Sequence, residues 1–389
     1  MVLQRRSQRF ESLPAGPYYA GLVLSGLATV LLGPILPLIG QQWALTDAQS
    51  GSLFTAQFTA SILGAVLSSY YRRYCVVLGY AAIAIGLGMV SFFRYAPALA
   101  GFWFIGLGMG CSVTATNIIF GTEYPESRGS LLTRTNFFWG VGAVIAPQLV
   151  AAAEQRGALR LLVIALALAA LLIGLRLSPL LKRSTATDPE ELQSERGNVG
   201  AGIFMLFSVI LFLYVGTETT FAGWIASYAH RFEDLSMARS SLVVSAFWLA
   251  LVIGRALSPL MLRFFSEFTA LLAGILAALA GMLLLLSRHS MNITLAAVVL
   301  AGLGCAPIFP LITSRLLARV GRSRSSGWIF AICGSGGAVL PWLTGLVSEH
   351  SGSLRSAFVV PVAAIAVILM CVLIENRLPT PPPVSISRQ

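Results

Sequence analysis

One carboxylate, Glu218, lies deep within a long apolar stretch of the sequence and is the residue best suited to carry chemistry. An unpaired ionised side chain in a hydrocarbon environment costs about 3 kcal/mol or more, so such a group must be paired, protonated or hydrated. Because burial disfavours the charged form, a carboxylate facing a water-filled cavity can take up a proton on one side of a membrane and release it on the other. Glu218 is therefore predicted to couple proton movement or to accept hydrogen bonds from solute hydroxyls. The alternative is a structural ion pair with a buried arginine such as Arg255.

Four side chains next to Glu218 recur at the spacing of one helical face. Thr217, Phe221, Trp224 and Tyr228 are separated by steps of four, three and four residues, which aligns them along one stripe of a helix. Hydroxyl groups and aromatic rings suit a sugar, whose ring stacks on aromatic faces while its hydroxyls require hydrogen bonds. Thr217, Phe221 and Trp224 are therefore predicted to bind solute. Tyr228 is expected in an aromatic belt at the membrane interface, a role equally open to Trp224.

The first half of the chain carries its own polar groups within apolar stretches. These groups are Gln57, Asn117, Asn136 and the amphipathic side chain of Trp139. Buried amides need hydrogen-bond partners, and a bound solute can supply them, so all four are predicted to bind solute. Polar side chains also hold membrane helices together, at about 1 kcal/mol or less each, and this second role stays open for each residue.

The apolar stretches that position these residues must cross a membrane. Of 389 residues, 57% are hydrophobic and only 11% are charged, and the mean hydropathy is +0.82. A hydrocarbon core of about 30 Å requires roughly 20 helical residues, and stretches such as 161–175 are apolar on every face, which argues against barrel strands. We predict an all-α polytopic membrane protein with twelve transmembrane helices. The predicted spans are 17–40, 51–71, 75–94, 98–120, 130–152, 158–178, 200–228, 238–262, 267–287, 291–313, 326–347 and 354–375.

Basic residues predict how these spans are oriented. With the N-terminus inside, the cytoplasmic segments hold 18 of the 26 Lys and Arg residues, the outer loops hold 7, and Arg255 lies within a span. Positive residues concentrate in cytoplasmic loops, so both termini are expected to be cytoplasmic. The same rule explains the net charge of +11 without a nucleic-acid partner.

The two halves of the sequence resemble each other. One ungapped alignment has an offset of 195 residues and a second has an offset of 190, and both fall at matching places in the two halves. The matched pairs include Gly142 with Gly337, Glu154 with Glu349, Gly157 with Gly352, Gly64 with Gly254 and Arg73 with Arg263. This repeat predicts two pseudo-symmetric six-helix bundles, residues 1–180 and 200–376, joined by a cytoplasmic linker at 181–199 and followed by a disordered tail at 377–389.

This plan resembles the major facilitator superfamily, over nearly the whole chain. The family's loop between spans 2 and 3 usually reads G-x-L-A-D-R-x-G-R-R, and residues 64–73 keep the glycine and the terminal arginines but have Ser68 at the acidic position. The resemblance implies a cytoplasmic gate at Arg72, Arg73, Arg255 and Arg263, although Ser68 removes the acidic partner of the family's gating salt bridge.

Within that superfamily, three stretches are most similar to the fucose/glucose/mannose proton symporters. They begin at Leu31 (LLGPILPLIGQQWALTDAQSG), Asn117 (NIIFGTEYPESRGSLLTRTNFFWGVGAVIAP) and Tyr214 (YVGTETTFAGWIASY). The resemblance implies proton symport of a hexose-type sugar by alternating access, with Glu218 as the coupling carboxylate and Trp224 as the stacking ring. The same fold also supports export of drugs or apolar metabolites by proton antiport, so substrate class is not decided by fold.

The sequence carries no signature of an enzyme. It has three histidines and five cysteines but no HExxH, P-loop, nucleophile-elbow or CxxC pattern. We therefore expect no catalytic activity, no cofactor and no metal, with an ion gradient of protons or sodium as the energy source. A monomer in the inner membrane, with a small-molecule substrate, is the expected setting.

Overall fold

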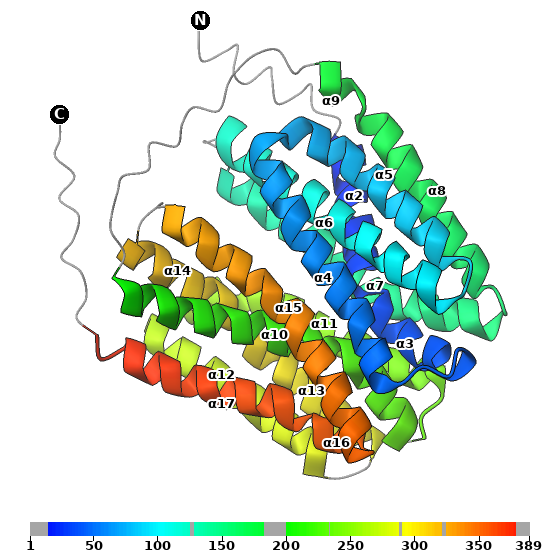
Figure 1. Ribbon diagram of the computed structural model, residues 1–389. Helices are drawn as coiled ribbons and strands as arrows, with labels where there is room; N and C mark the ends of the chain where they lie inside the picture. The colour runs from blue at the N-terminus through cyan, green and yellow to red at the C-terminus, as the bar shows by residue number, and fades with distance from the viewer. Residues whose placement is uncertain are drawn as a thin grey trace, which may run out of the picture.

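The computed structural model describes residues 15–124, 128–182, 200–232, 234–287, 290–320 and 324–378, and every regular element in these ranges is a helix (Figure 1). Of the predicted linker at 181–199 and the predicted tail at 377–389, residues 183–199 and 379–389 lie outside the described residues. The helices are α2 (Ala15–Val30), α3 (Leu32–Gln42), α4 (Asp47–Tyr70), α5 (Arg72–Val90), α6 (Tyr95–Glu123), α7 (Arg128–Gln155), α8 (Leu159–Leu177), α9 (Pro179–Lys182), α10 (Ala201–Phe232), α11 (Met237–Met261), α12 (Glu267–Ser287), α13 (Met291–Cys305), α14 (Ile308–Val320), α15 (Arg324–Ser351), α16 (Leu354–Ala357) and α17 (Val359–Glu375).

Twelve segments of the described chain are long and apolar enough to cross a membrane, as the sequence predicted. Two of these spans are interrupted. The first is divided into α2 and α3 around Leu31, and the tenth is divided into α13 and α14 at Ala306 and Pro307. Proline has no amide hydrogen and its ring collides with the preceding turn, which accounts for a break at Pro307.

The helices form two bundles, which we call the N-terminal bundle (α2–α9) and the C-terminal bundle (α10–α17) (Figure 1). The bundles meet along two seams, one between α4 and α15 and the other between α7 and α11, with α3 also packed on α10. The sequence repeat pairs α4 with α11 and α7 with α15, so the two seams are equivalent under the pseudo-symmetry. The prediction of two pseudo-symmetric bundles is confirmed.

Two repeated glycines show that the symmetry extends to backbone detail. Gly157 and Gly352, matched at the offset of 195, have φ values of +60° and +66°. Glycine adopts this left-handed conformation without the clash that a Cβ causes. Each glycine follows the end of its helix, α7 or α15, and allows the chain to reverse into the next span.

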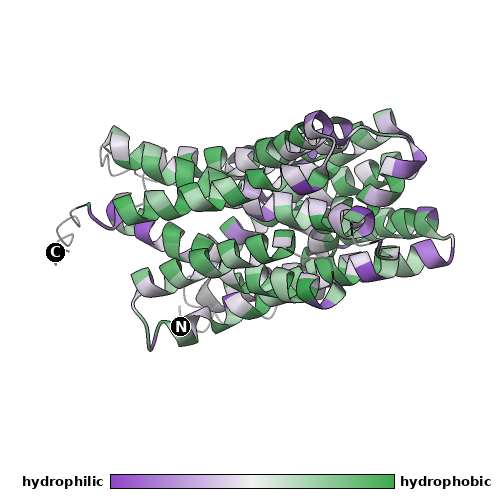
Figure 2. Cartoon of the chain, turned by 90° about the horizontal axis from the view of Figure 1, so that it is seen from below, coloured by the Kyte–Doolittle hydropathy of each residue, from purple (hydrophilic) through white to green (hydrophobic). Residues whose placement is uncertain are grey.

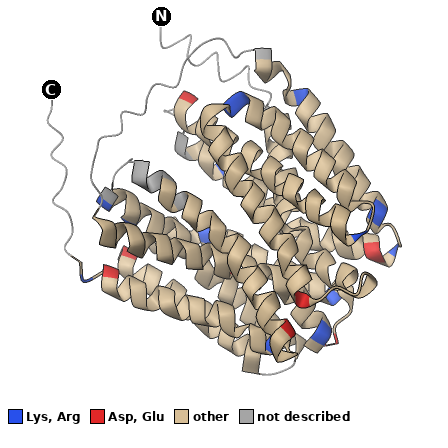
Figure 3. Cartoon of the chain, viewed as in Figure 1, with Lys and Arg blue, Asp and Glu red and all other residues tan. Residues whose placement is uncertain are grey.

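The two ends of the bundles gather different segments of the chain. The start of α2, the end of α9, the start of α10 and the end of α17 lie at one end, which we call the termini side (Figure 1). The loops at 43–46 and 234–236 lie at the opposite end, which we call the far side. Apolar residues cover the middle of the helices (Figure 2), and most charged residues lie near the helix ends (Figure 3). This distribution is the one that a membrane-spanning protein requires.

Candidate functional site

The far side is where charged and polar groups join the two bundles. Asp47, in the first turn of α4, accepts two hydrogen bonds from Arg231 of α10, at 2.7 and 2.9 Å, and a third from Ser348 of α15 at 2.5 Å. Glu349 accepts a hydrogen bond from the backbone N–H of Ala48 at 3.0 Å. We call Asp47, Ala48, Arg231, Ser348 and Glu349 the far-side latch. The latch holds the start of α4, the end of α15 and the end of α10 together.

Local sequence places Asp47 for this role. Thr46 caps α4, and its side chain and that of Gln49 form a reciprocal capping box, which fixes where the helix begins. A carboxylate in the first turn is favoured by the partial positive charge of the helix N-terminus. Asp47 was not predicted as a functional residue, because its arginine partner lies 184 residues away in the sequence.

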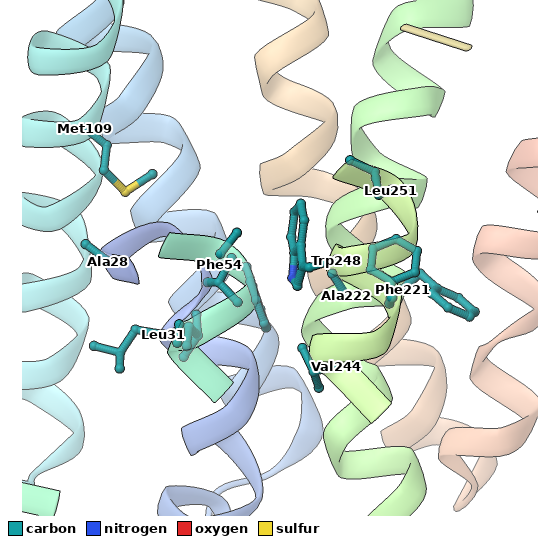
Figure 4. Close-up of a cluster of buried hydrophobic side chains, with 14 of the residues drawn as sticks. Ala28, Leu31, Phe54, Met109, Phe221, Ala222, Val244, Trp248 and Leu251 are labelled. Atoms are coloured by element: carbon teal, nitrogen blue, oxygen red, sulfur yellow. The ribbon is translucent and has the colours of Figure 1, made fainter. Parts of the chain in front are cut away.

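Along the seams, apolar contacts are accompanied by hydrogen bonds from Thr55 to the Ala338 carbonyl at 2.8 Å and from Gln148 to Ser245 at 3.1 Å. Trp139 of α7 and Trp248 of α11 meet edge to face with ring centroids 5.5 Å apart. Figure 4 shows Trp248 projecting from α11 towards Phe54, within a cluster that includes Leu31 and Phe221. Apolar packing across the centre separates the far side from the termini side in this conformation.

Towards the termini side, the ion pairs lie within the bundles. In the N-terminal bundle, Arg73 and Glu123 pair at 3.3 Å. In the C-terminal bundle, Glu375 is fully buried and accepts hydrogen bonds from Arg315 and Arg319 of α14. The two bundles diverge towards this side (Figure 1). The latch on the far side therefore holds the two bundles together at that end.

Glu218 lies in the C-terminal bundle at the centre of a polar cluster. Its Oε2 accepts a hydrogen bond from Arg255 of α11 at 3.0 Å and another from the Tyr214 hydroxyl one helical turn away. The Tyr214 hydroxyl also lies 3.0 Å from the carbonyl oxygen of Cys305. We call Tyr214, Glu218, Arg255 and the Cys305 carbonyl the α10 polar cluster.

The cluster is not sealed inside the protein. The Glu218 side chain keeps 15% of its surface exposed and the Arg255 side chain keeps 30%. Charged surface at this depth of a span is costly against lipid, so we expect it to face water. The ion pair with Arg255, which the sequence offered as the alternative to a coupling role for Glu218, is present, and part of the Glu218 surface remains exposed.

The aromatic stripe of α10 is buried inside the protein. Trp224 is fully buried, its indole N–H donates to the Pro341 carbonyl at 3.0 Å, and its ring lies 6.3 Å from that of Phe54 in the N-terminal bundle. Phe221 is fully buried between the rings of Phe247 and Phe358. Neither ring is accessible to a solute in this conformation.

Two further members of the stripe are also inside. Thr217 is fully buried, and its hydroxyl has no hydrogen-bond partner among the described residues. Tyr228 is fully buried and donates to the Leu285 carbonyl at 3.2 Å. A buried ring does not contact lipid, so the prediction of an interfacial position for Tyr228 is wrong. Helical spacing shows which residues share a stripe but not which way the stripe faces.

The predicted residues of the N-terminal bundle are spread over different environments. Gln57 is fully buried and its amide nitrogen donates to the Thr29 carbonyl at 3.2 Å. Asn117 is partly buried, with a side-chain oxygen that lacks a partner among the described residues. Asn136 is exposed and donates to the Leu132 carbonyl of its own helix at 2.9 Å. Of this set, Trp139 is the one with a described ring contact across the interface.

The predicted gating arginines also separate. Arg73 pairs with Glu123 on the termini side, Arg72 is partly buried next to it, and Arg263 is exposed beyond the end of α11. Arg255 belongs to the α10 polar cluster. Arg255 thus pairs with Glu218 and does not lie with the other predicted gating arginines.

Ser68, which replaces the family's acidic residue, packs the N-terminal bundle. It is fully buried, and its hydroxyl lies 2.9 Å from the Gly64 carbonyl and 3.0 Å from the Cys111 carbonyl. An ionised side chain would not be tolerated among these carbonyl oxygens. Serine therefore suits the contact between α4 and α6. Among the described residues, no group of three or more metal-ligating side chains is found.

Two pseudo-symmetric six-span bundles, joined on one side and carrying a partly exposed carboxylate in a span, are typical of membrane transporters of the alternating-access class. The chain belongs to the Major Facilitator Superfamily, whose family model matches residues 18–328. The family and fold are those of multi-pass membrane transporters of small molecules.

Similar proteins agree with this assignment. Bypass of stop codon protein 6 from Saccharomyces cerevisiae is 22% identical over 377 residues, which cover 85% of this chain and 76% of that protein. The E. coli fucose:proton symporter FucP, in the outward conformation, has a TM-score of 0.62 at 19% identity, covering 94% of this chain and 99% of FucP. A bacterial homologue of the lysosomal transporter Spinster, inward-facing and unoccupied, has a TM-score of 0.73 at 16% identity, covering 93% of this chain and 96% of that one.

Proposed function

We propose that this protein is a proton-coupled secondary transporter of a small neutral solute, a hexose-type sugar by symport, with Glu218 as the proton-binding group. The observation that carries the proposal is a carboxylate at mid-span that is paired with Arg255 and keeps part of its side chain exposed. Protonation would cancel the charge on Glu218 and weaken its attraction to Arg255. Binding of a proton and breaking of the ion pair are thereby linked.

Uncharged polar groups support a neutral polar solute. In the N-terminal bundle, the oxygens of Gln57 and Asn117 lack hydrogen-bond partners among the described residues, and unpaired buried acceptors favour a ligand that donates. Sugar hydroxyls are such donors. The likeness to FucP, described as a fucose:proton symporter, points to the same solute class.

We further propose that the protein is a monomer in the inner membrane and that both of its termini lie in the cytoplasm. The excess of arginine in the predicted cytoplasmic segments supports it. The far-side latch would then close the outer face, which makes this conformation inward-facing. The higher TM-score to the inward-facing Spinster homologue than to outward-facing FucP supports the same assignment.

A second candidate is export of drugs or apolar metabolites by proton antiport. It is favoured by the apolar cluster at the centre of the interface, which includes Leu31, Phe54 and Trp248 (Figure 4). Apolar walls bind apolar ligands through burial of surface. The two candidates differ in the solute that moves and in its direction relative to the proton.

Uptake into proteoliposomes tests the proposal. Hexoses and apolar dyes are offered with and without imposed pH and sodium gradients. We expect a hexose to accumulate with the pH gradient, and Glu218→Gln to abolish accumulation while preserving solute exchange. Glu267→Gln, which removes an exposed carboxylate at the start of α12, is the matched control and is expected to behave as wild type. Full accumulation by Glu218→Gln would exclude the role of Glu218, and dye transport alone would favour the exporter.

A further inference from the structure

The hydroxyl of Tyr214 is the point at which the groups of the α10 polar cluster meet. Tyr214 is 1% exposed. Its oxygen accepts a hydrogen bond from Arg255 at 3.4 Å, and its hydrogen can be directed to the Glu218 carboxylate or to the Cys305 carbonyl, 3.0 Å away. Two acceptors therefore compete for one donor.

A phenolic hydroxyl has a single proton, so Tyr214 donates to one of these acceptors at a time. When Glu218 is ionised it is the stronger acceptor, because hydrogen bonds to charged groups are about twice as strong as neutral ones. When Glu218 is protonated, its Oε2–H can donate to the Tyr214 oxygen. The Tyr214 hydrogen then turns to the Cys305 carbonyl.

The Cys305 carbonyl lies at a special place in the chain. Cys305 is the last residue of α13, and α14 begins at Ile308 after the break at Ala306 and Pro307. A hydrogen bond from Tyr214 to this carbonyl ties α10 to the break within the tenth span. When this hydrogen bond is lost, Tyr214 no longer restrains the break.

We propose that Tyr214 is a positioning residue that transmits the protonation state of Glu218 to the break between α13 and α14. In the ionised state Tyr214 is held by Glu218. In the protonated state it holds the Cys305 carbonyl and ties the break to α10. The proposal rests on the proton-coupling role of Glu218, and it adds the path by which the proton changes the conformation of the span.

Other ionisable groups near Glu218 come from three neighbouring helices. Arg255 approaches from α11, the Cys305 thiol from the end of α13, and the Cys333 thiol from α15. Arg255 contacts both Glu218 and Tyr214, so its charge is present in either state. Tyr214 is the member of this group that bonds both the carboxylate and the break.

The test compares Tyr214→Phe with a matched control, Tyr228→Phe. Both tyrosines lie on α10, are fully buried and donate to a backbone carbonyl, but the described bond of Tyr228 is to Leu285, remote from Glu218. Spin labels at Arg94→Cys and Arg239→Cys, positions on the far side of opposite bundles, report opening of the far side. Their distance distribution is measured across a pH series in full-length protein, and solute exchange confirms that each variant is folded.

In wild type and Tyr228→Phe, we expect the distribution to change with pH, and in Glu218→Gln we expect it to be flat. Tyr214→Phe is expected to exchange solute but to lose most of the pH response, at least about fivefold, since a bond to a charged group is removed. A wild-type pH response in Tyr214→Phe, together with a flat Glu218→Gln, would overturn this inference and leave the proposed function intact. A wild-type response in Glu218→Gln would overturn both.

Discussion

The two bundles share one plan, yet they differ in where they hold charge. The described interior of the N-terminal bundle carries neutral polar groups such as Gln57, Ser68 and Ser112. The C-terminal bundle carries the partly exposed Glu218–Arg255 pair and the fully buried Glu375 with its two arginines. Neutral groups keep the same hydrogen bonds at every pH near neutrality, whereas charged groups can change with proton binding. On the proposed function, the C-terminal bundle would respond to protons and the N-terminal bundle would contact the neutral solute.

The largest effect is expected where charge is most deeply buried. Glu375→Gln removes the counter-charge of Arg315 and Arg319, whose side chains are 16% and 7% exposed. Breaking a buried ion pair by removing one partner costs about 3–5 kcal/mol. Thermal unfolding of purified protein should therefore show a large loss of stability. A variant as stable as wild type would contradict the view that this bundle depends on its buried charge.

A smaller effect is expected at the latch that joins the bundles. Asp47→Asn removes the charge that pairs with Arg231, and the Asp47 side chain is 12% exposed. A partly buried charge-assisted bond contributes about 1.5–3 kcal/mol, so the population open on the far side should rise roughly tenfold or more. Spin labels at Arg94→Cys and Arg239→Cys measure this population. An unchanged distance distribution would show that the latch does not hold the far side.

The smallest effect is expected in the N-terminal bundle. Glu123→Gln breaks the pair with Arg73, in which the Arg73 and Glu123 side chains are 30% and 37% exposed. Exposed salt bridges contribute about 1 kcal/mol or less. Thermal stability should change little, and pH-driven accumulation should persist. If Glu123→Gln proved as damaging as Glu375→Gln, the contrast between the bundles would be lost.

The fold was largely predictable because its signal is strong and local. Apolar runs of membrane length give the spans, and the offset between Gly157 and Gly352 gives the repeat, which the shared left-handed backbone then explains. The pairing of Glu218 with Arg255 could be predicted as an alternative role, because few ionisable groups lie within spans. The bond of Tyr214 to the Cys305 carbonyl could not be predicted, since every residue has a backbone carbonyl and the sequence does not show which one accepts a bond.

The sequence could not predict which way a helical stripe faces, nor which residues far apart in the chain form pairs. Trp224 and Tyr228 are on the predicted stripe, but both rings are fully buried, and Trp224 also packs against Phe54 of the N-terminal bundle. Asp47 and Arg231 occupy polar helix ends that look ordinary until the two bundles are brought together. Trp248, which meets Trp139 across the interface, lies in the apolar run 246–254, where its residue type does not distinguish it from a packing residue.

Proton movement during solute uptake tests the central claim most directly. Solute is added to proteoliposomes that contain a pH indicator and no imposed gradient, and the internal pH is followed with time. For wild type the account predicts internal acidification that accompanies solute entry, and for Glu218→Gln it predicts solute equilibration without acidification. Equal acidification in Glu218→Gln, or solute entry without acidification in wild type, would contradict it.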